Sequence, residues 1–327
     1  MYVLEIQVNI DNGRKAHNTL ALLSEKLNKH KGESVTIDFK RVTFIAANQM
    51  AVFSALFDSF CANENSRIVI QNLSEKLSNV MRKNGFGQML GMEPKEDSFH
   101  TTIPHRRFFI SEIDESEKYL LFHIFQRDDI PLMISEAKNA IIDNMLEIFN
   151  NVKEHTSTKN IYSCGQFFPQ SAVLYFTVAD IGETIKYNVD RYGESEMEMC
   201  NRIQWAMQEG NSTRKNGTPG GLGFSVLSKF VRLNRGQLPS VDKGTHGRRR
   251  ANFCPCFVAF LPRTSSTRQS SALQGQKLTS FRLSDPDHRY FGHLQGGRLR
   301  RTGRTLIEDN AENDRNIMVQ GVCPLVH

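Results

Sequence analysis

Residues 147–155 read Glu147-Ile148-Phe149-Asn150-Asn151-Val152-Lys153-Glu154-His155. Three polar residues of this stretch, Glu147, Asn151 and His155, are four positions apart, so on a helix they project from one face. We expect a half-buried helix over Ser135 to Val152, with its opposite face covered by Met145, Ile148, Phe149 and Val152. A carboxylate and an amide one turn apart can hold Mg²⁺ and orient a water. A solvated helix face is the alternative interpretation.

A second candidate motif follows an apolar run. Residues 173–179 favour a strand, and the strand is expected to end in Asp180-Ile181-Gly182. The glycine lets the backbone approach closely, and the carboxylate at the end of the strand can accept a hydrogen bond from an adenine amino group. An ordinary turn after a strand would have the same sequence.

A glycine-rich loop comes later, at Gly217-Thr218-Pro219-Gly220-Gly221-Leu222-Gly223-Phe224, before a helix expected over 225–230. Glycines let backbone N–H groups reach phosphate oxygens, and a helix N-terminus favours anions. The loop is neither a P-loop nor a dinucleotide-binding fingerprint, because the required Lys and the preceding strand are missing. Taken alone, the pattern also fits a flexible loop.

The order of the three motifs resembles that of the GHKL (Bergerat-fold) ATPase superfamily, which includes histidine kinases and anti-sigma-factor kinases. Glu147 and Asn151 match its N box, Asp180 and Gly182 its G1 box, and the run from Gly220 to Gly223 its G2 box. The additional His155 is most similar to the anti-sigma-factor kinase branch.

The resemblance implies ATP and Mg²⁺ as cofactors. Asn151 would coordinate the metal and Glu147 would polarise the attacking nucleophile. Asp180 would bind the adenine and Gly182 would let the base approach. The glycine-rich loop would close over the phosphates as a lid, with Gly220, Gly221 and Gly223 as its binding residues. Thr184 stands where the family has the second glycine of the G1 box, and it is the remaining cofactor-binding position.

The first hundred residues alternate between strand and helix patterns. We expect strands over 3–10, 35–39 and 67–70, and helices over 18–27, 50–60 and 73–81. The segments 35–39 and 42–45, with the loop that follows them, resemble the STAS domain of anti-sigma-factor antagonists. That family often carries a phosphorylatable Asp-Ser-Ser-Gly loop, where this chain has Ala46-Ala47-Asn48-Gln49. Phospho-regulation is therefore not carried over, and a generic α/β domain is the alternative.

The fold class expected is α/β. A STAS-like domain over residues 1–100 precedes a Bergerat-type α/β sandwich over 101–243, and a mostly irregular tail follows over 244–327. Within the second domain we place strands at 108–110, 119–125 and 162–166.

The tail carries the excess positive charge of the chain. The net charge is +6, and residues 244–327 hold 13 Lys+Arg against 6 Asp+Glu, which leaves 28 against 29 for residues 1–243. Only residues 257–261 could supply a further strand there. The tail is either a disordered basic arm or an unnatural continuation such as a translated frameshift. The composition changes within an element, which favours the frameshift.

Six cysteines without metal-ligand spacing indicate reduced thiols. With no signal-peptide pattern and no apolar run of about 18 residues, we expect a cytoplasmic protein without a membrane partner.

Three functions remain open. The chain is an ATP-dependent protein kinase or ATPase acting on a protein partner, with a homodimer allowed, or it is a nucleotide-controlled binding switch that does not turn over. A nucleic-acid binder using the basic tail ranks last, because the tail lacks interleaved aromatic residues.

Overall fold

The computed structural model describes residues 2–127, 135–171, 173–182, 185–192, 205, 256–260 and 317–319. These form a mixed α/β protein with two four-stranded sheets. The first sheet has the order β1-β2-β3-β8 and the second the order β4-β5-β6-β7.

The N-terminal unit, residues 2–100, supplies three of the four strands of the first sheet. Its strands β1 (Tyr2–Glu5), β2 (Ser34–Asp38) and β3 (Arg67–Leu73) are parallel, with Leu4 opposite Ile37 and Ile37 opposite Ile70. Parallel neighbours require crossover connections, and α1 (Arg14–Lys29) and α2 (Met50–Cys61) supply them. The predicted strand over 3–10 is shorter than expected, because the chain leaves the sheet after Glu5 and returns only as an isolated bridge between Ile10 and Ile45.

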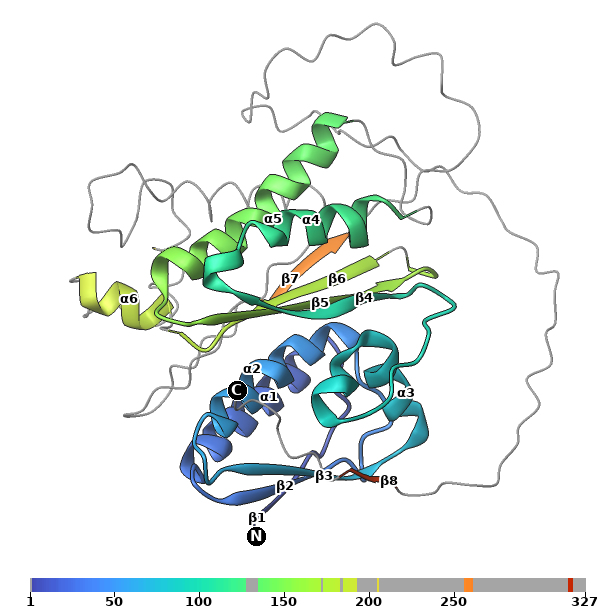
Figure 1. The fold of residues 1–327 in the computed structure, drawn as a ribbon, viewed down its shortest axis with the longest axis vertical. Helices are drawn as coiled ribbons and strands as arrows, with labels where there is room; N and C mark the ends of the chain where they lie inside the picture. The colour runs from blue at the N-terminus through green and yellow to red at the C-terminus, as the bar shows by residue number, and fades with distance from the viewer. Residues whose placement is uncertain are drawn as a thin grey trace, which may run out of the picture.

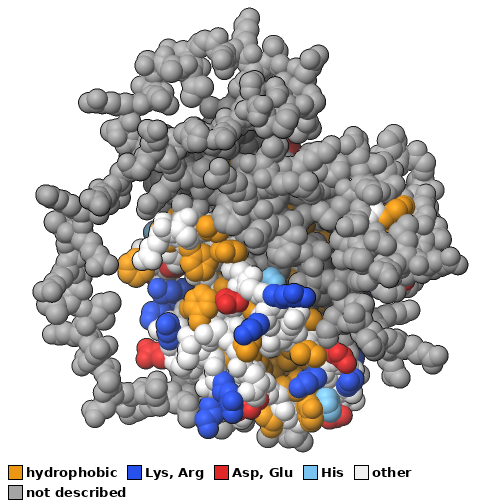
Figure 2. Space-filling model, turned by 180° about the vertical axis from the view of Figure 1, so that it is seen from behind, with side chains coloured by type: hydrophobic (Ala, Val, Ile, Leu, Met, Phe, Trp, Pro, Cys, Tyr) orange, Lys and Arg blue, Asp and Glu red, His pale blue; other side chains and the backbone are white. Residues whose placement is uncertain are grey.

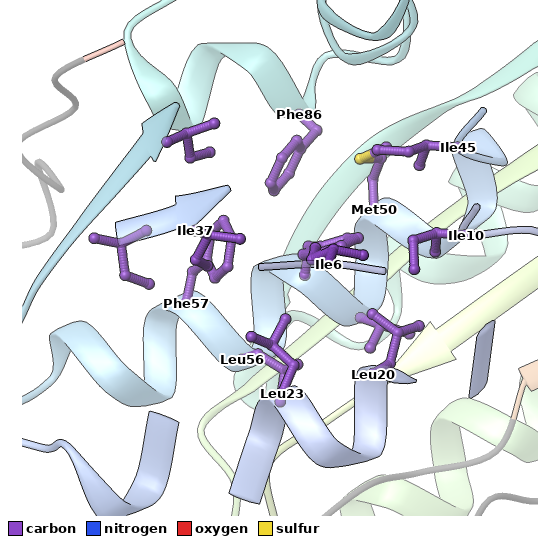
Figure 3. Close-up of a cluster of buried hydrophobic side chains, with 14 of the residues drawn as sticks. Ile6, Ile10, Leu20, Leu23, Ile37, Ile45, Met50, Leu56, Phe57 and Phe86 are labelled. Carbon is purple, nitrogen blue, oxygen red and sulfur yellow. The ribbon is translucent and has the colours of Figure 1, made fainter. Parts of the chain in front are cut away.

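The core of the N-terminal unit lies between this sheet and its helices (Figures 1 and 3). The third helix, α3 (Glu75–Asn84), begins at Ser74, whose side chain accepts a hydrogen bond from the Leu77 amide, and ends at Gly85 in the left-handed conformation. η2 (Phe86–Leu90) then places Phe86 in the core, where its ring packs against Phe57 at 6.0 Å between centroids. Figure 3 shows the cluster that these rings share with the aliphatic side chains Ile6, Ile10, Leu20, Leu23, Ile37, Ile45, Met50 and Leu56.

The second sheet is antiparallel. It contains β4 (Thr102–Phe109), β5 (Asn160–Phe168), β6 (Val173–Ala179) and β7 (Cys256–Phe260). α4 (Glu115–Leu120) and α5 (Ser135–His155) cover one of its faces (Figure 1). α6 (Ile185–Tyr192) follows β6 in the chain.

One predicted strand is wrong. Residues 119–125 form the end of α4 and η4 (Leu121–Phe125), after the short η3 (Ile110–Glu112). From the start of α4 to the end of η4 the buried side chains are Ser116, Tyr119, Leu120 and Ile124, and this spacing of three to four belongs to a helix. A short apolar run does not separate the two structures by itself. The acidic residues Glu115 and Glu117 in the first turn favour the helix, because negative charge is stabilising at a helix N-terminus.

The predicted tail contributes two strands. β7 pairs with β6 over five residues, with Phe257 opposite Phe176, which confirms a strand at this position. β8 (Ile317–Val319) pairs antiparallel with β3 in the first sheet, so the prediction that only residues 257–261 could form a strand in the tail is wrong. The rest of residues 244–327 lies outside the described part of the chain.

The N-terminal unit packs against the free face of the second sheet, so that α2 lies between the two sheets (Figure 1). Ser54 Oγ on α2 is 2.6 Å from His105 Nε2 on β4, and Asp58 accepts hydrogen bonds from Asn160 and from the Tyr162 hydroxyl on β5. Burial, aided by the charge of Arg107, lowers the pKa of His105 to about 4, so the imidazole is neutral at pH 7. Burial, together with the Asp58 carboxylate, raises the pKa of Tyr162, so its hydroxyl keeps the proton it donates. The His105, Asn160 and Tyr162 side chains that make these contacts are therefore uncharged at pH 7.

Figure 2 shows the surface of the described residues from behind. Lys and Arg side chains are interspersed with Asp and Glu on the visible face. Charges of both signs are therefore mixed over the described residues that this view shows.

Candidate functional site

The helix α5 has the predicted division into faces. Its apolar side chains are buried in the core of the second unit and pack with Phe176 and Val178 of β6: Met145, Ile148, Phe149 and Val152. Each such burial contributes about 1.5–3 kcal/mol to stability. Glu147 and Asn151 are half-buried, whereas Asp143 and Asn150 on the same helix are exposed. Glu147 and Asn151 therefore lie at the edge of the packed face and not on the solvated one.

Asn151 has a buried donor to satisfy. Its Nδ2 atom is buried, and the described residues offer it no hydrogen-bond acceptor. A buried donor without a partner costs about 1–3 kcal/mol, so a bound acceptor, such as a phosphate oxygen or a water, would be favoured there. Rotation of the amide would present Oδ1 instead, which is the kind of oxygen that Mg²⁺ takes as a ligand.

The strand β6 points Asp180 towards the helix layer. Leu174, Phe176 and Val178 pack with α5, and alternation along the strand places the next even position, Asp180, on the same side. Asp180 is only 3% exposed. Its Oδ1 accepts a hydrogen bond from the Gly182 amide at 2.6 Å, which fixes the turn after the strand. A carboxylate is thus held inside the protein at the end of a strand, as the sequence predicts.

The end of α5 touches this turn through Thr156, a residue that the motifs did not predict. A Cβ atom on Gly182 would lie 2.3 Å from Thr156 Cβ and 2.6 Å from Thr156 Oγ1. Thr156 is itself fixed, because its hydroxyl donates to the Val152 carbonyl at 2.9 Å. The structure therefore brings the end of the helix with Glu147 and Asn151 against the turn with Asp180 and Gly182. A threonine directly after a helix is common, so the sequence alone could not predict this contact.

Other predicted site residues lie outside the described part of the chain: Thr184, Gly220, Gly221 and Gly223. His155 is the last residue of α5, and its side chain is not described.

Binding of Mg-ATP does not require a metal site formed by several protein side chains. Among the described residues, no group of three or more His, Cys, Asp or Glu side chains could hold a metal ion. Mg²⁺ at nucleotide sites is usually bound through one or two protein ligands, with phosphates and waters completing the octahedron. The amide oxygen of Asn151 is the kind of single protein ligand that this mode uses.

The contact between Thr156 and Gly182 leads to a stability prediction. Gly182→Ala is expected to lower the unfolding free energy by about 1–3 kcal/mol, because the new methyl group overlaps Thr156. At about 2–4 °C per kcal/mol, the melting temperature falls by several degrees. The same substitution in a Thr156→Gly background should cost much less, since the colliding side chain is gone. Equal losses of melting temperature in both backgrounds would show that the two residues do not touch.

Within the described residues, no helix is long and apolar enough to cross a membrane. Comparison of the chain with protein-family models, curated proteins and solved structures found no match.

Proposed function

We propose that the chain binds Mg-ATP between α5 and the turn after β6, in the manner of the GHKL ATPases that its motifs resemble. The observation that carries the proposal is the contact of Thr156 with Gly182. It joins two motifs that are about 30 residues apart in the sequence, and the GHKL interpretation needs them at one site.

Asp180 is the adenine-binding residue in this proposal. Its buried carboxylate accepts from the Gly182 amide and would also accept from the amino group of the base. A hydrogen bond to a charged, buried acceptor is worth about 1.5–3 kcal/mol, so this residue would contribute much of the nucleobase affinity.

Glu147 acts on the nucleophile. It is half-buried one helical turn before Asn151, at the edge of the packed face of α5. A carboxylate beside a metal-bound phosphate can orient and deprotonate an attacking hydroxyl or water. This placement favours turnover, by hydrolysis or by transfer to a protein partner. A nucleotide-controlled binding switch would use the same site without turnover.

The N-terminal unit is proposed to be a STAS-like domain. Its parallel strands β1, β2 and β3 with helical crossovers support this. η1 (Ala47–Gln49), which lies where that family often has its phosphorylatable loop, has no hydroxyl and is buried. The phospho-acceptor of a kinase reaction would therefore not be η1, and we propose that it belongs to a separate protein.

Asn151→Ala is expected to weaken Mg-ATP binding by about tenfold, or 1.4 kcal/mol, because it removes a ligand of the metal that bridges the phosphates. Binding of ATP in EDTA should change far less. Calorimetric titration of both proteins with ATP, with and without Mg²⁺, measures the two losses. Asn150→Ala, an exposed neighbour on the same helix, is the matched control. Equal losses with and without Mg²⁺ would remove the metal role from Asn151.

A further inference from the structure

One of the links between the two units is a buried side-chain amide, that of Asn48 in η1. Asn48 Nδ2 donates to Asn12 Oδ1 at 2.7 Å, in the loop before α1, and to Thr177 Oγ1 at 3.0 Å, on β6. Asn48 is 1% exposed and Thr177 is fully buried. A loop of the N-terminal unit is thereby connected, through a single amide group, to the strand that leads to Asp180.

Other atoms of η1 contact the neighbouring strand, β5, beside Thr177. Cys164 on β5 is directly opposite Thr177 in the antiparallel ladder. Its Sγ lies 3.2 Å from the carbonyl oxygens of both Ala47 and Asn48 and accepts from the Ala51 amide at 3.1 Å. η1 therefore contacts the opposed residues Cys164 and Thr177, and its Ala47 amide donates to Gln166 Oε1 on β5 at 2.7 Å.

β6 is held from both faces at this point. Thr177 faces η1, whereas Phe176 and Val178 pack into the core with α5. Asp180 follows Thr177 by three residues, and Gly182 is bonded to it. Because a packed strand moves as a unit, a displacement of β6 at Thr177 would displace the turn that carries Asp180.

We propose that Asn48 and Thr177 are positioning residues for the nucleotide site, and that the N-terminal unit is its built-in regulator. The inference rests on the proposed function. Asn12, Asn48 and Thr177 form a chain of two hydrogen bonds. This chain holds β6 in the position in which Asp180 and Gly182 can contact the base. A change in the loop before α1 that withdraws Asn12 loosens Asn48 and lowers the affinity for nucleotide.

The test compares Thr177→Val with Thr177→Ser in the full-length protein, by calorimetric titration with Mg-ATP. Valine keeps the shape of the side chain but removes Oγ1, whereas serine keeps the hydroxyl. We expect Thr177→Val to weaken Mg-ATP binding about fivefold or more, as is typical of coupling between sites, and Thr177→Ser to restore most of the affinity. Asn12→Ala, at the far end of the series, should weaken binding in the same direction.

Ser54→Ala is the matched control. It also breaks a hydrogen bond between the units, but its partner His105 lies on β4 and not on β6. Both substitutions are expected to lower the melting temperature, and only Thr177→Val should lower the affinity. The positioning role is overturned, while the proposed function stands, if the wild type binds Mg-ATP and Thr177→Val binds it equally well. The same conclusion holds if Ser54→Ala loses as much affinity for Mg-ATP as Thr177→Val does. A wild type that does not bind Mg-ATP overturns the proposed function itself.

Discussion

Glu147→Ala is expected to leave the affinity for Mg-ATP nearly unchanged and to lower hydrolysis or phosphoryl transfer by about 10²–10⁴-fold, the usual cost of removing a general base. The physical reason is position. Glu147 lies one turn before Asn151 on α5 at the edge of the packed face, whereas Asp180, the proposed adenine-binding residue, directly follows β6. Loss of the carboxylate would therefore affect the attacking group and not the base.

The measurement is a phosphate-release or phosphotransfer assay beside a nucleotide titration. Asp143→Ala serves as the control, because Asp143 is on the same helix one turn earlier and exposed. It should leave both quantities unchanged. A Glu147→Ala protein with wild-type turnover would end the catalytic assignment. A wild type that binds Mg-ATP without any turnover would instead favour the binding switch.

Much of the fold could be predicted from the sequence, because local periodicity is strong where elements are half-buried. Leu20, Leu23 and Leu27 at helical spacing are all buried in α1, and Val35 and Ile37 face the core from β2 as their alternation predicts. Residues 119–125 were predicted wrongly, because every position from 119 to 122 is apolar or aromatic and no period is visible from that run alone.

The candidate site was predictable in its residue types but not in its contacts. The spacing of Glu147 and Asn151 and the position of Asp180 at a strand end follow from helix and strand periods. The contacts of Thr156 with Gly182 and of Asn48 with Thr177 join residues 26 and 129 positions apart. No local pattern encodes such a distance, since it is set by the way α5 and α2 pack on the two faces of the second sheet.

The packing of the N-terminal unit against the second sheet could not be predicted from the sequence either. The polar residues that face the interface, such as Ser54, Asp58 and His105, have no period that separates them from surface residues. Their partners lie in the other unit, so their burial becomes apparent only when both units are seen together.

We propose that Asp180 holds the base of a bound ATP, and the substitution Asp180→Asn tests this role. Asparagine keeps the size of the side chain and an Oδ1 that can accept from the Gly182 amide at its present 2.6 Å, so the turn should survive. What it loses is the charged acceptor, and its amide can turn a donor towards the amino group of adenine. At about 1.5–3 kcal/mol for such a hydrogen bond, the affinity should fall about 10–100-fold.

The measurement is calorimetric titration of the wild type and of Asp180→Asn with Mg-ATP, with melting temperatures recorded to show that both are folded. We predict a Kd for Asp180→Asn that is about 10–100 times that of the wild type, at a similar melting temperature. Equal affinity for Mg-ATP in the two folded proteins would show that Asp180 does not bind the base.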